Sequence, residues 1–292
     1  MPLYFTKPRR WPPSRPVQFV LAFLALLLTL AVLAVWLFIG YRNNKSPEQP
    51  DEGASSAVSE PLAGVGNLLL IINEADHEQF VLIQAAPDAG RMTAVPLPAN
   101  LDVGDGVTLC DTLRKHGSPR AKQAVATLLE LPIKQYITLT AKDAESYFGY
   151  LDEGITLTLS EEITYTDKNG ATIHLSAGEK TLAAGQAAAL LQYTGWKEPE
   201  NGLNLAADLM VALLNRYLTP LRSMEGHFAA LSNAAQTDLR IDDFNAYRST
   251  LAHLAAKNDG NLCRRVVLDG STVDNLFVPD MASFRAQSGL YD

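Results

Sequence analysis

The sequence contains little cysteine and little histidine. Two Cys and five His occur among its 292 residues, and they show no cluster with the spacing of metal ligands. One disulfide between Cys110 and Cys263 could form. A domain of this size needs no such bond, however, so both are interpreted as small residues in or near the core. The sequence therefore indicates neither a His/Cys metal site nor a disulfide-dependent fold.

Basic residues are scarce in the larger part of the chain. Of the 24 Lys and Arg, four precede residue 19, which leaves 20 against all 32 Asp and Glu, a formal charge of −12. An acidic surface repels nucleic acid and anionic lipid, so neither is expected as a partner. No G-x-S-x-G motif occurs either, so a hydrolase of that type has no support.

Residues 19–41 contain no charged side chain. As a helix they reach roughly 35 Å, enough for a hydrocarbon core of about 30 Å. The run ends in aromatic rather than small residues, which favours an uncleaved transmembrane helix over a cleaved signal peptide. More basic residues precede it than follow it at Arg42 and Lys45, so residues 1–18 are predicted to be a cytoplasmic tail. We expect a single-pass protein of the cell membrane with an extracytoplasmic domain.

Residues 42–66 are rich in Ser, Pro, Glu and Gly without an apolar period, and are predicted to be a disordered stalk. Residues 67–292 suit one domain. Apolar runs at 67–73 and 79–85 predict buried strands. Further along the chain, strands and helices alternate, which is typical of an α/β fold.

Three local signals refine this pattern. Ser118 is a plausible N-cap for a helix over residues 118–131. The pair Asn169-Gly170 suits the tight turn of a hairpin. The segment "GEKTLAAGQAAALLQYTGW", residues 178–196, predicts a turn followed by a helix with an apolar face.

The order of these segments resembles the LytR-CpsA-Psr (cell envelope-related transcriptional attenuator) domain of bacterial envelope proteins. Many weak matches in the right order carry the resemblance, among them "PRAKQAVATLLELPIKQYITL", "LDEGITLTLSEEI" and "IHLSAGEKTLAAGQAAALLQY". It covers about residues 68–218 and extends more faintly through "TDLRIDDFNAYRSTLAHLA" to a closing "VVLDGSTVDNLFVPD". The chain is identified on this basis as a divergent relative of that family.

The resemblance implies a three-layer α/β/α domain whose helices and mixed central sheet enclose a long apolar pocket for a polyprenyl chain. Members of the family move a glycopolymer from polyprenyl pyrophosphate onto peptidoglycan with the help of a divalent cation, Mg²⁺ or Mn²⁺. Forked Arg donors and metal-binding carboxylates suit the charge that develops on phosphate. In this chain the resemblance implies that the pocket residues include Leu182, Ala187, Ala188, Leu190 and Leu191.

The charged positions of the family pattern are not retained. Where the family has "RSDT", "PRD", an arginine after the apolar helix and "GR..RQQ", this chain has Asp76-His77-Glu78-Gln79, Pro98-Ala99-Asn100, Gln192, and Gly202-Leu203 with Ala206-Ala207-Asp208. Only Glu78 keeps its carboxylate, which makes it the one candidate metal ligand. We therefore favour a catalytically degenerate domain that binds polyprenyl-linked precursors or partners in cell-wall assembly.

Two alternatives remain open. An active phosphotransferase would need replacement cations, for which "LRKHGSPRAK" around a helix start is the best source: Arg114, Lys115, Arg120 and Lys122. The same residues could equally be a solvated charge run. A pure protein-interaction module would have its pocket filled by side chains, so an open pocket would argue against it.

Overall fold

The described part of the chain is an α/β domain. The computed structural model describes residues 66–74, 77–149, 154–167, 169–217, 232–257 and 262–291, all of which belong to one compact unit, Val58–Asp292. The predicted tail, the predicted span and the stalk up to residue 65 lie outside the described residues. Among the residues that are described, no helix combines the length and the hydropathy needed to cross a membrane.

Groups of strands and groups of helices follow one another along the chain, in the mixed α/β order that the sequence pattern predicted. The strands are β1 (Gly66–Ile72), β2 (Gln79–Ala86), β3 (Arg91–Leu97), β4 (Ile133–Leu139), β5 (Ile155–Leu159), β6 (Ile163–Thr166), β7 (Thr172–Leu175), β8 (Gly178–Leu182), β9 (Gln236–Thr237), β10 (Cys263–Arg265), β11 (Gly270–Val273) and β12 (Leu276–Pro279). The helices are α2 (Leu109–His116), α3 (Ser118–Leu129), α4 (Ala141–Phe148), α5 (Ala184–Leu191), α6 (Pro199–Tyr217), α8 (Ile241–Lys257) and α9 (Met281–Ser288).

A mixed sheet with the strand order β10-β3-β2-β1-β4-β9 forms the centre. Strand β1 pairs antiparallel with β2 and parallel with β4. Every residue of β1 and β2 is buried, as their continuous apolar runs require. The two strands predicted from those runs are therefore confirmed. Smaller antiparallel pairs, β5–β8, β6–β7 and β11–β12, lie outside this sheet.

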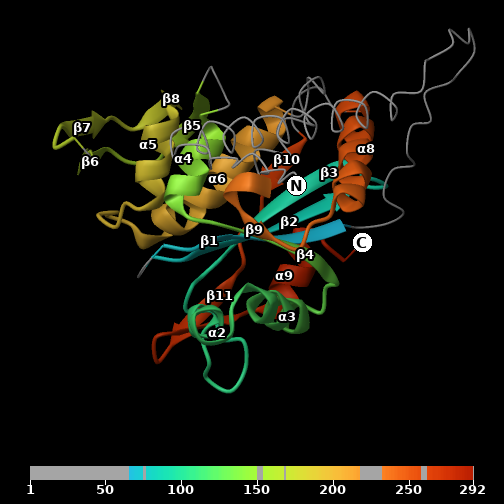
Figure 1. The fold of residues 1–292 in the computed structure, drawn as a ribbon. Coiled ribbons are helices and arrows are strands. Elements are labelled where there is room, and N and C mark those ends of the chain that lie inside the picture. Colours follow the sequence, from blue (N-terminus) through green and yellow to red (C-terminus); the bar gives the residue numbers. More distant parts are fainter. Residues whose placement is uncertain are drawn as a thin grey trace, which may run out of the picture. The chain divides into compact units, whose positions relative to one another are not determined.

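Helices cover both faces of the sheet (Figure 1). We name the side under α2, α3 and α9 the α3 face, and the side under α4, α5, α6 and α8 the α6 face. Because successive side chains of a strand point to opposite faces, β1 contributes to both. Leu69 and Ile71 join the apolar cluster of the α3 face, whereas Leu68, Leu70 and Ile72 join that of the α6 face.

Some of the local predictions are confirmed and others were wrong. The hairpin around Asn169-Gly170 is confirmed as β6–β7. In residues 178–196 the predicted helix with an apolar face is confirmed as α5. The turn predicted before it was wrong, because Gly178–Leu182 is strand β8, which pairs with β5. Ser118 was wrongly predicted as an N-cap, because it is buried within the first turn of α3 and its hydroxyl lies 2.8 Å from that of Thr138. Gly117, with a φ of 77°, occupies the cap position and turns the chain sharply from α2 into α3.

Candidate functional site

An apolar cavity of about 210 Å³ lies between the sheet and the helices of the α6 face. Its floor follows β1 from Gly66 to Ile72, a length of roughly 20 Å at the rise of a strand. An apolar cavity of about 150 Å³ can stay dry and hold a hydrocarbon such as benzene, so this one suits an apolar chain. Residues of α4, α5, α6 and α8 close it, among them Ala144, Tyr147, Phe148, Leu191, Ala206, Leu209, Met210, Leu213, Leu214, Phe244, Tyr247 and Leu251.

The pocket residues implied by the family resemblance lie in three different settings. Leu191 lines the apolar cavity. Leu182, Ala187 and Leu190 are fully buried in the surrounding apolar cluster. Ala188 instead lines a polar cleft. Sequence reasoning missed the larger contribution of α6 and α8, such as Met210 and Phe244; the only available signal was the helical spacing of apolar residues there.

The polar cleft has a volume of about 890 Å³ and lies between the β6–β7 hairpin and helices α4 and α5. It is a separate space from the apolar cavity, because the two helices present different residues to each. Ala144 and Leu191 line the cavity, whereas Glu145 and Ala188 line the cleft. The helix pair α4–α5 therefore forms a wall between an apolar and a polar space.

Polar residues gather where β1 and β4 end, close to Ile72 and Leu139 at the floor of the cavity. The carboxylate of Glu74 accepts hydrogen bonds from the backbone N–H of Ala141 and from Gln192, the latter at 3.2 Å. A carboxylate is stabilised at a helix N-terminus such as that of α4. The position at which the family pattern has an arginine thus holds an amide bonded to an acid.

Next to Glu74, the side chain of Gln79, in contact with His77, ties the start of β2 to helix α5. The Gln79 amide donates to the carbonyl of Leu191 at 2.9 Å and lies 3.1 Å from the His77 ring. Burial lowers the pKa of His77 from its ordinary value, although the carboxylates of Glu78 and Glu74 oppose this effect, so the shift favours the neutral ring. The buried Oε1 of Gln79 has no hydrogen-bond partner. This group of residues therefore supplies no cation for a phosphate.

Glu78 forms a two-pronged ion pair with Arg114 of α2. The guanidinium donates to Oε1 at 2.5 Å and to Oε2 at 2.9 Å, and the Glu78 side chain is only 5% exposed. Burial raises the pKa of Glu78, but the hydrogen bonds from Arg114, a backbone N–H and Cys110 outweigh it and hold that pKa below 4.5. Burial and the bond to Glu78 raise the pKa of the Cys110 thiol to about 11.

The same ion pair bears on metal binding. Both oxygens of Glu78 already accept from Arg114, which neutralises the charge that a divalent cation would need. Across the described residues, no group of three His, Cys, Asp or Glu side chains is arranged to hold a metal ion. The residues present at Glu78 therefore do not fit Mg²⁺ or Mn²⁺.

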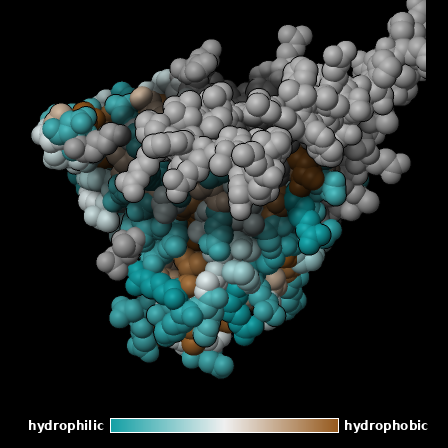
Figure 2. Space-filling model, viewed as in Figure 1, coloured by the Kyte–Doolittle hydropathy of each residue, from teal (hydrophilic) through white to brown (hydrophobic). Residues whose placement is uncertain are grey.

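The four basic residues around the start of α3 contact different partners. Lys115 lies 3.8 Å from Asp111, and Arg120 donates to Gln123 at 2.7 Å. Lys122 donates to Asp238 at 2.6 Å. Helices α2 and α3, which carry these cations, cover the face of the sheet opposite the cavity, and the described surface there is mostly hydrophilic (Figures 1 and 2). The structure thus does not bring Arg114, Lys115, Arg120 and Lys122 together around one ligand.

Several of the remaining family positions have structural contacts, and Asp76 lies outside the described residues. The Ala99 carbonyl accepts from the backbone of Cys110 at 2.9 Å. Asn100 donates to the carbonyl of Asn275 at 2.8 Å. Asp208 on α6 forms an ion pair of 2.5 Å with Arg265 of β10. These residues therefore stabilise the fold by contacts within the domain.

Comparison with solved structures gives a clear likeness in fold. The crystal structure of B. subtilis TagV matches with a TM-score of 0.65 over 78% of this chain and 96% of that chain, at 16% identity. The domain has the fold of that protein. A proposed transcription regulator from Eubacterium siraeum matches with a TM-score of 0.68 over 78% of this chain and 91% of that chain, at 16% identity.

TagT bound to LI-WTA matches with a TM-score of 0.60 over 79% of this chain and 91% of that chain, at 14% identity. TagV and TagT are LytR-CpsA-Psr proteins. At such low identities the likeness concerns the fold alone. The sequence itself matches no protein-family model and no curated protein.

Proposed function

We propose that this chain is a cell-envelope protein that binds a polyprenyl-linked precursor in its apolar cavity without transferring the attached glycan. In this proposal residues 19–41 anchor it in the cell membrane, with residues 1–18 in the cytoplasm and the domain outside. The apolar cavity along β1 is the observation that carries the proposal. The fold likeness to TagT and TagV, proteins related to cell-wall glycopolymer attachment, supports it.

The charge distribution argues against phosphotransfer. Among the described residues, the ends of β1 and β4 carry the carboxylates Glu74 and Glu78, and the guanidinium beside them, Arg114, is bound to Glu78. Developing phosphate charge would meet a net negative site. Losing a forked Arg contact costs about 2–4 kcal/mol of transition-state stabilisation, so several losses together leave no measurable rate. The filled-pocket alternative, a pure interaction module, is disfavoured by the open cavity.

Native mass spectrometry of the detergent-extracted full chain tests lipid binding. We expect a co-purified polyprenyl phosphate or pyrophosphate species. Met210→Trp places a larger side chain in the cavity; each displaced CH₂ is worth about 0.8 kcal/mol, so losing two or more weakens binding by about tenfold or more. Met281→Trp is the matched control, because Met281 is a half-buried methionine that packs on the α3 face.

A transfer assay separates the inert from the active alternative. The purified protein with labelled polyprenyl pyrophosphate glycan and Mg²⁺ or Mn²⁺ should show background turnover. Changing Arg114, Lys115, Arg120 and Lys122 to Ala should then leave the turnover at background. Turnover that depends on these four residues would overturn the non-catalytic proposal and leave the lipid-binding proposal standing. The lipid-binding proposal fails if the purified protein carries no lipid and Met210→Trp does not change lipid binding.

A further inference from the structure

One wall of the apolar cavity differs from the others in how it is attached to the rest of the domain. Leu239, Phe244, Tyr247 and Leu251, from the segment formed by β9 and α8, close the cavity beside strand β4. Among the described residues of α8, the buried apolar side chains are those of Leu251 and Leu254, whereas Ile241 is 54% exposed. In α6, by contrast, five apolar residues are buried: Leu205, Ala206, Ala207, Leu209 and Leu213.

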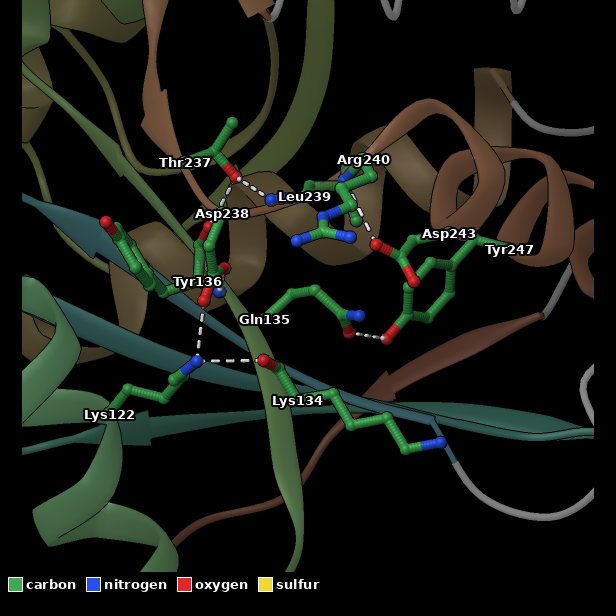
Figure 3. A network of polar contacts seen from close by, with 10 residues as sticks. All are labelled: Lys122, Lys134, Gln135, Tyr136, Thr237, Asp238, Leu239, Arg240, Asp243 and Tyr247. Carbon is green, nitrogen blue, oxygen red and sulfur yellow. Dashed lines mark hydrogen bonds and ion pairs between the residues drawn. The ribbon is translucent and has the colours of Figure 1, made fainter.

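Polar contacts at the edge of the sheet hold this wall in place (Figure 3). Strand β9 pairs with β4 through two residues only, Thr237 with Ile137 and Gln236 with Thr138. The carboxylate of Asp238 accepts from the backbone N–H of Tyr136 at 2.7 Å and from Lys122 at 2.6 Å. We name Asp238 with these two donors the Asp238 clasp.

Three further bonds belong to the same attachment. The hydroxyl of Thr237 donates to the carbonyl of Tyr136 at 2.5 Å. Lys122 also donates to the carbonyl of Lys134 at 2.8 Å, so its ammonium bridges α3, β4 and the clasp. On the cavity side, the hydroxyl of Tyr247 donates to Gln135 at 3.0 Å. These bonds converge on consecutive residues of β4, so breaking the clasp weakens the attachment of the β9–α8 segment at the place where it meets the sheet.

We propose that the β9–α8 segment is a gate, held by the Asp238 clasp, through which an apolar chain enters and leaves the cavity beside β4. A wall that rests on a two-residue strand and a partly exposed ion pair opens at lower cost than one held by buried apolar side chains. The inference rests on the proposed lipid-binding function, and it assigns Lys122 to the gate instead of to a phosphate.

Rates of binding distinguish a gate from an ordinary structural contact. Anthranilate-labelled farnesyl phosphate is mixed with the detergent-solubilised full chain, and its association and dissociation are followed by stopped-flow fluorescence. In Asp238→Asn we expect both rates to rise about threefold to tenfold, while the dissociation constant stays the same. Glu130→Gln, which removes the ion pair of Glu130 with Arg285 between α3 and α9, is the control and leaves both rates unchanged.

A reversible lock tests the gate without touching the clasp. Gln236 and Thr138 are cross-strand partners, and such partners lie about 4.5–5.5 Å apart, within reach of a disulfide. In the double variant Gln236→Cys/Thr138→Cys, oxidation should slow entry and release and reduction should restore both. The wild-type chain under the same oxidant controls for Cys110 and Cys263.

The outcomes separate the two proposals. If the probe does not bind the wild-type protein, the proposed lipid-binding function fails and the gate fails with it. If the probe binds but the lock leaves its rates unchanged, the gate alone is overturned. The gate proposal is also overturned if Asp238→Asn changes the dissociation constant of the probe but not its association rate. The clasp would then stabilise the bound state and would not control entry.

Discussion

The two faces of the central sheet are built from similar residues but packed to different degrees. On the α3 face, Leu69 and Ile71 of β1 have no exposed surface and contact the apolar side chains of α2, α3 and α9. On the α6 face, Leu68, Leu70 and Ile72 are also buried from the surface, yet they line a cavity. Burial alone therefore does not separate a residue that stabilises the fold from one that is available to a ligand.

The largest expected effect contrasts two adjacent leucines of β1. Leu69→Ala should lower the free energy of unfolding by about 3 kcal/mol, because it removes a side chain that is fully surrounded. Leu70→Ala should lower it by about half as much, since Leu70 borders the cavity and has fewer contacts to lose. Urea unfolding followed by tryptophan fluorescence measures both. Equal losses would show that the α6 face is packed as tightly as the α3 face.

A smaller effect is expected at the ion pair that joins α2 to the start of β2. Arg114→Ala leaves the buried carboxylate of Glu78 without its guanidinium and should cost about 1–3 kcal/mol at pH 7. Adding Glu78→Gln to that variant should recover part of the loss. If Arg114→Ala is as stable as the wild type, the pair is a surface contact.

The pH dependence of this pair follows from the sign of the pKa shift. The folded-state pKa of Glu78 lies below its ordinary 4.5. The stabilisation is therefore present above about pH 4.5 and is lost as the pH falls through the lower folded-state value. Urea unfolding between pH 7 and pH 3 should show this loss in the wild type, and the loss should be weaker in Arg114→Ala.

The smallest effect concerns the thiols, one on each face. Cys110 lies on α2, and Cys263 lies in the apolar cluster of the α6 face; both are free. Their pKa values are raised to about 11 and about 12, chiefly by burial, so at pH 8 about one thiol in a thousand or fewer is ionised. Iodoacetamide should modify both slowly.

Glu78→Gln sharpens this measurement. It removes a carboxylate that raises the pKa of Cys110, so Cys110 should react about threefold faster or more. Cys263 serves as the internal control in the same mass spectrum. Cys263 reacting faster than Cys110 in the wild type would mean that the α6 face opens at β10.

The sequence predicted the elements whose signal is local and strong. Continuous apolar runs identified β1 and β2, and Asn169-Gly170 identified the β6–β7 hairpin. Helix α2 was missed, because it offers a single apolar turn over eight residues. A signal was nevertheless present: the Thr108 hydroxyl caps the N–H of Asp111 at 2.9 Å, and Thr-x-x-Asp is a variant of the capping box.

The site was less predictable than the fold, for two physical reasons. Helical spacing shows that α6 and α8 have apolar faces, but it does not show whether residues such as Met210 and Phe244 meet a neighbour or border a cavity. Ion pairs also join distant positions: Glu78 binds Arg114, and Lys122 binds Asp238. A run of cations in sequence therefore does not reveal which of them are already neutralised.

The strand order has a consequence for how the chain folds as it is made. Both outer strands of the central sheet come from late segments: β10 pairs with β3, and β9 pairs with β4. A nascent chain that ends before them exposes β3 and β4 as unpaired edges, which are templates for association with other chains. The last fifth or so of the sequence therefore protects both edges of the sheet against association with other chains.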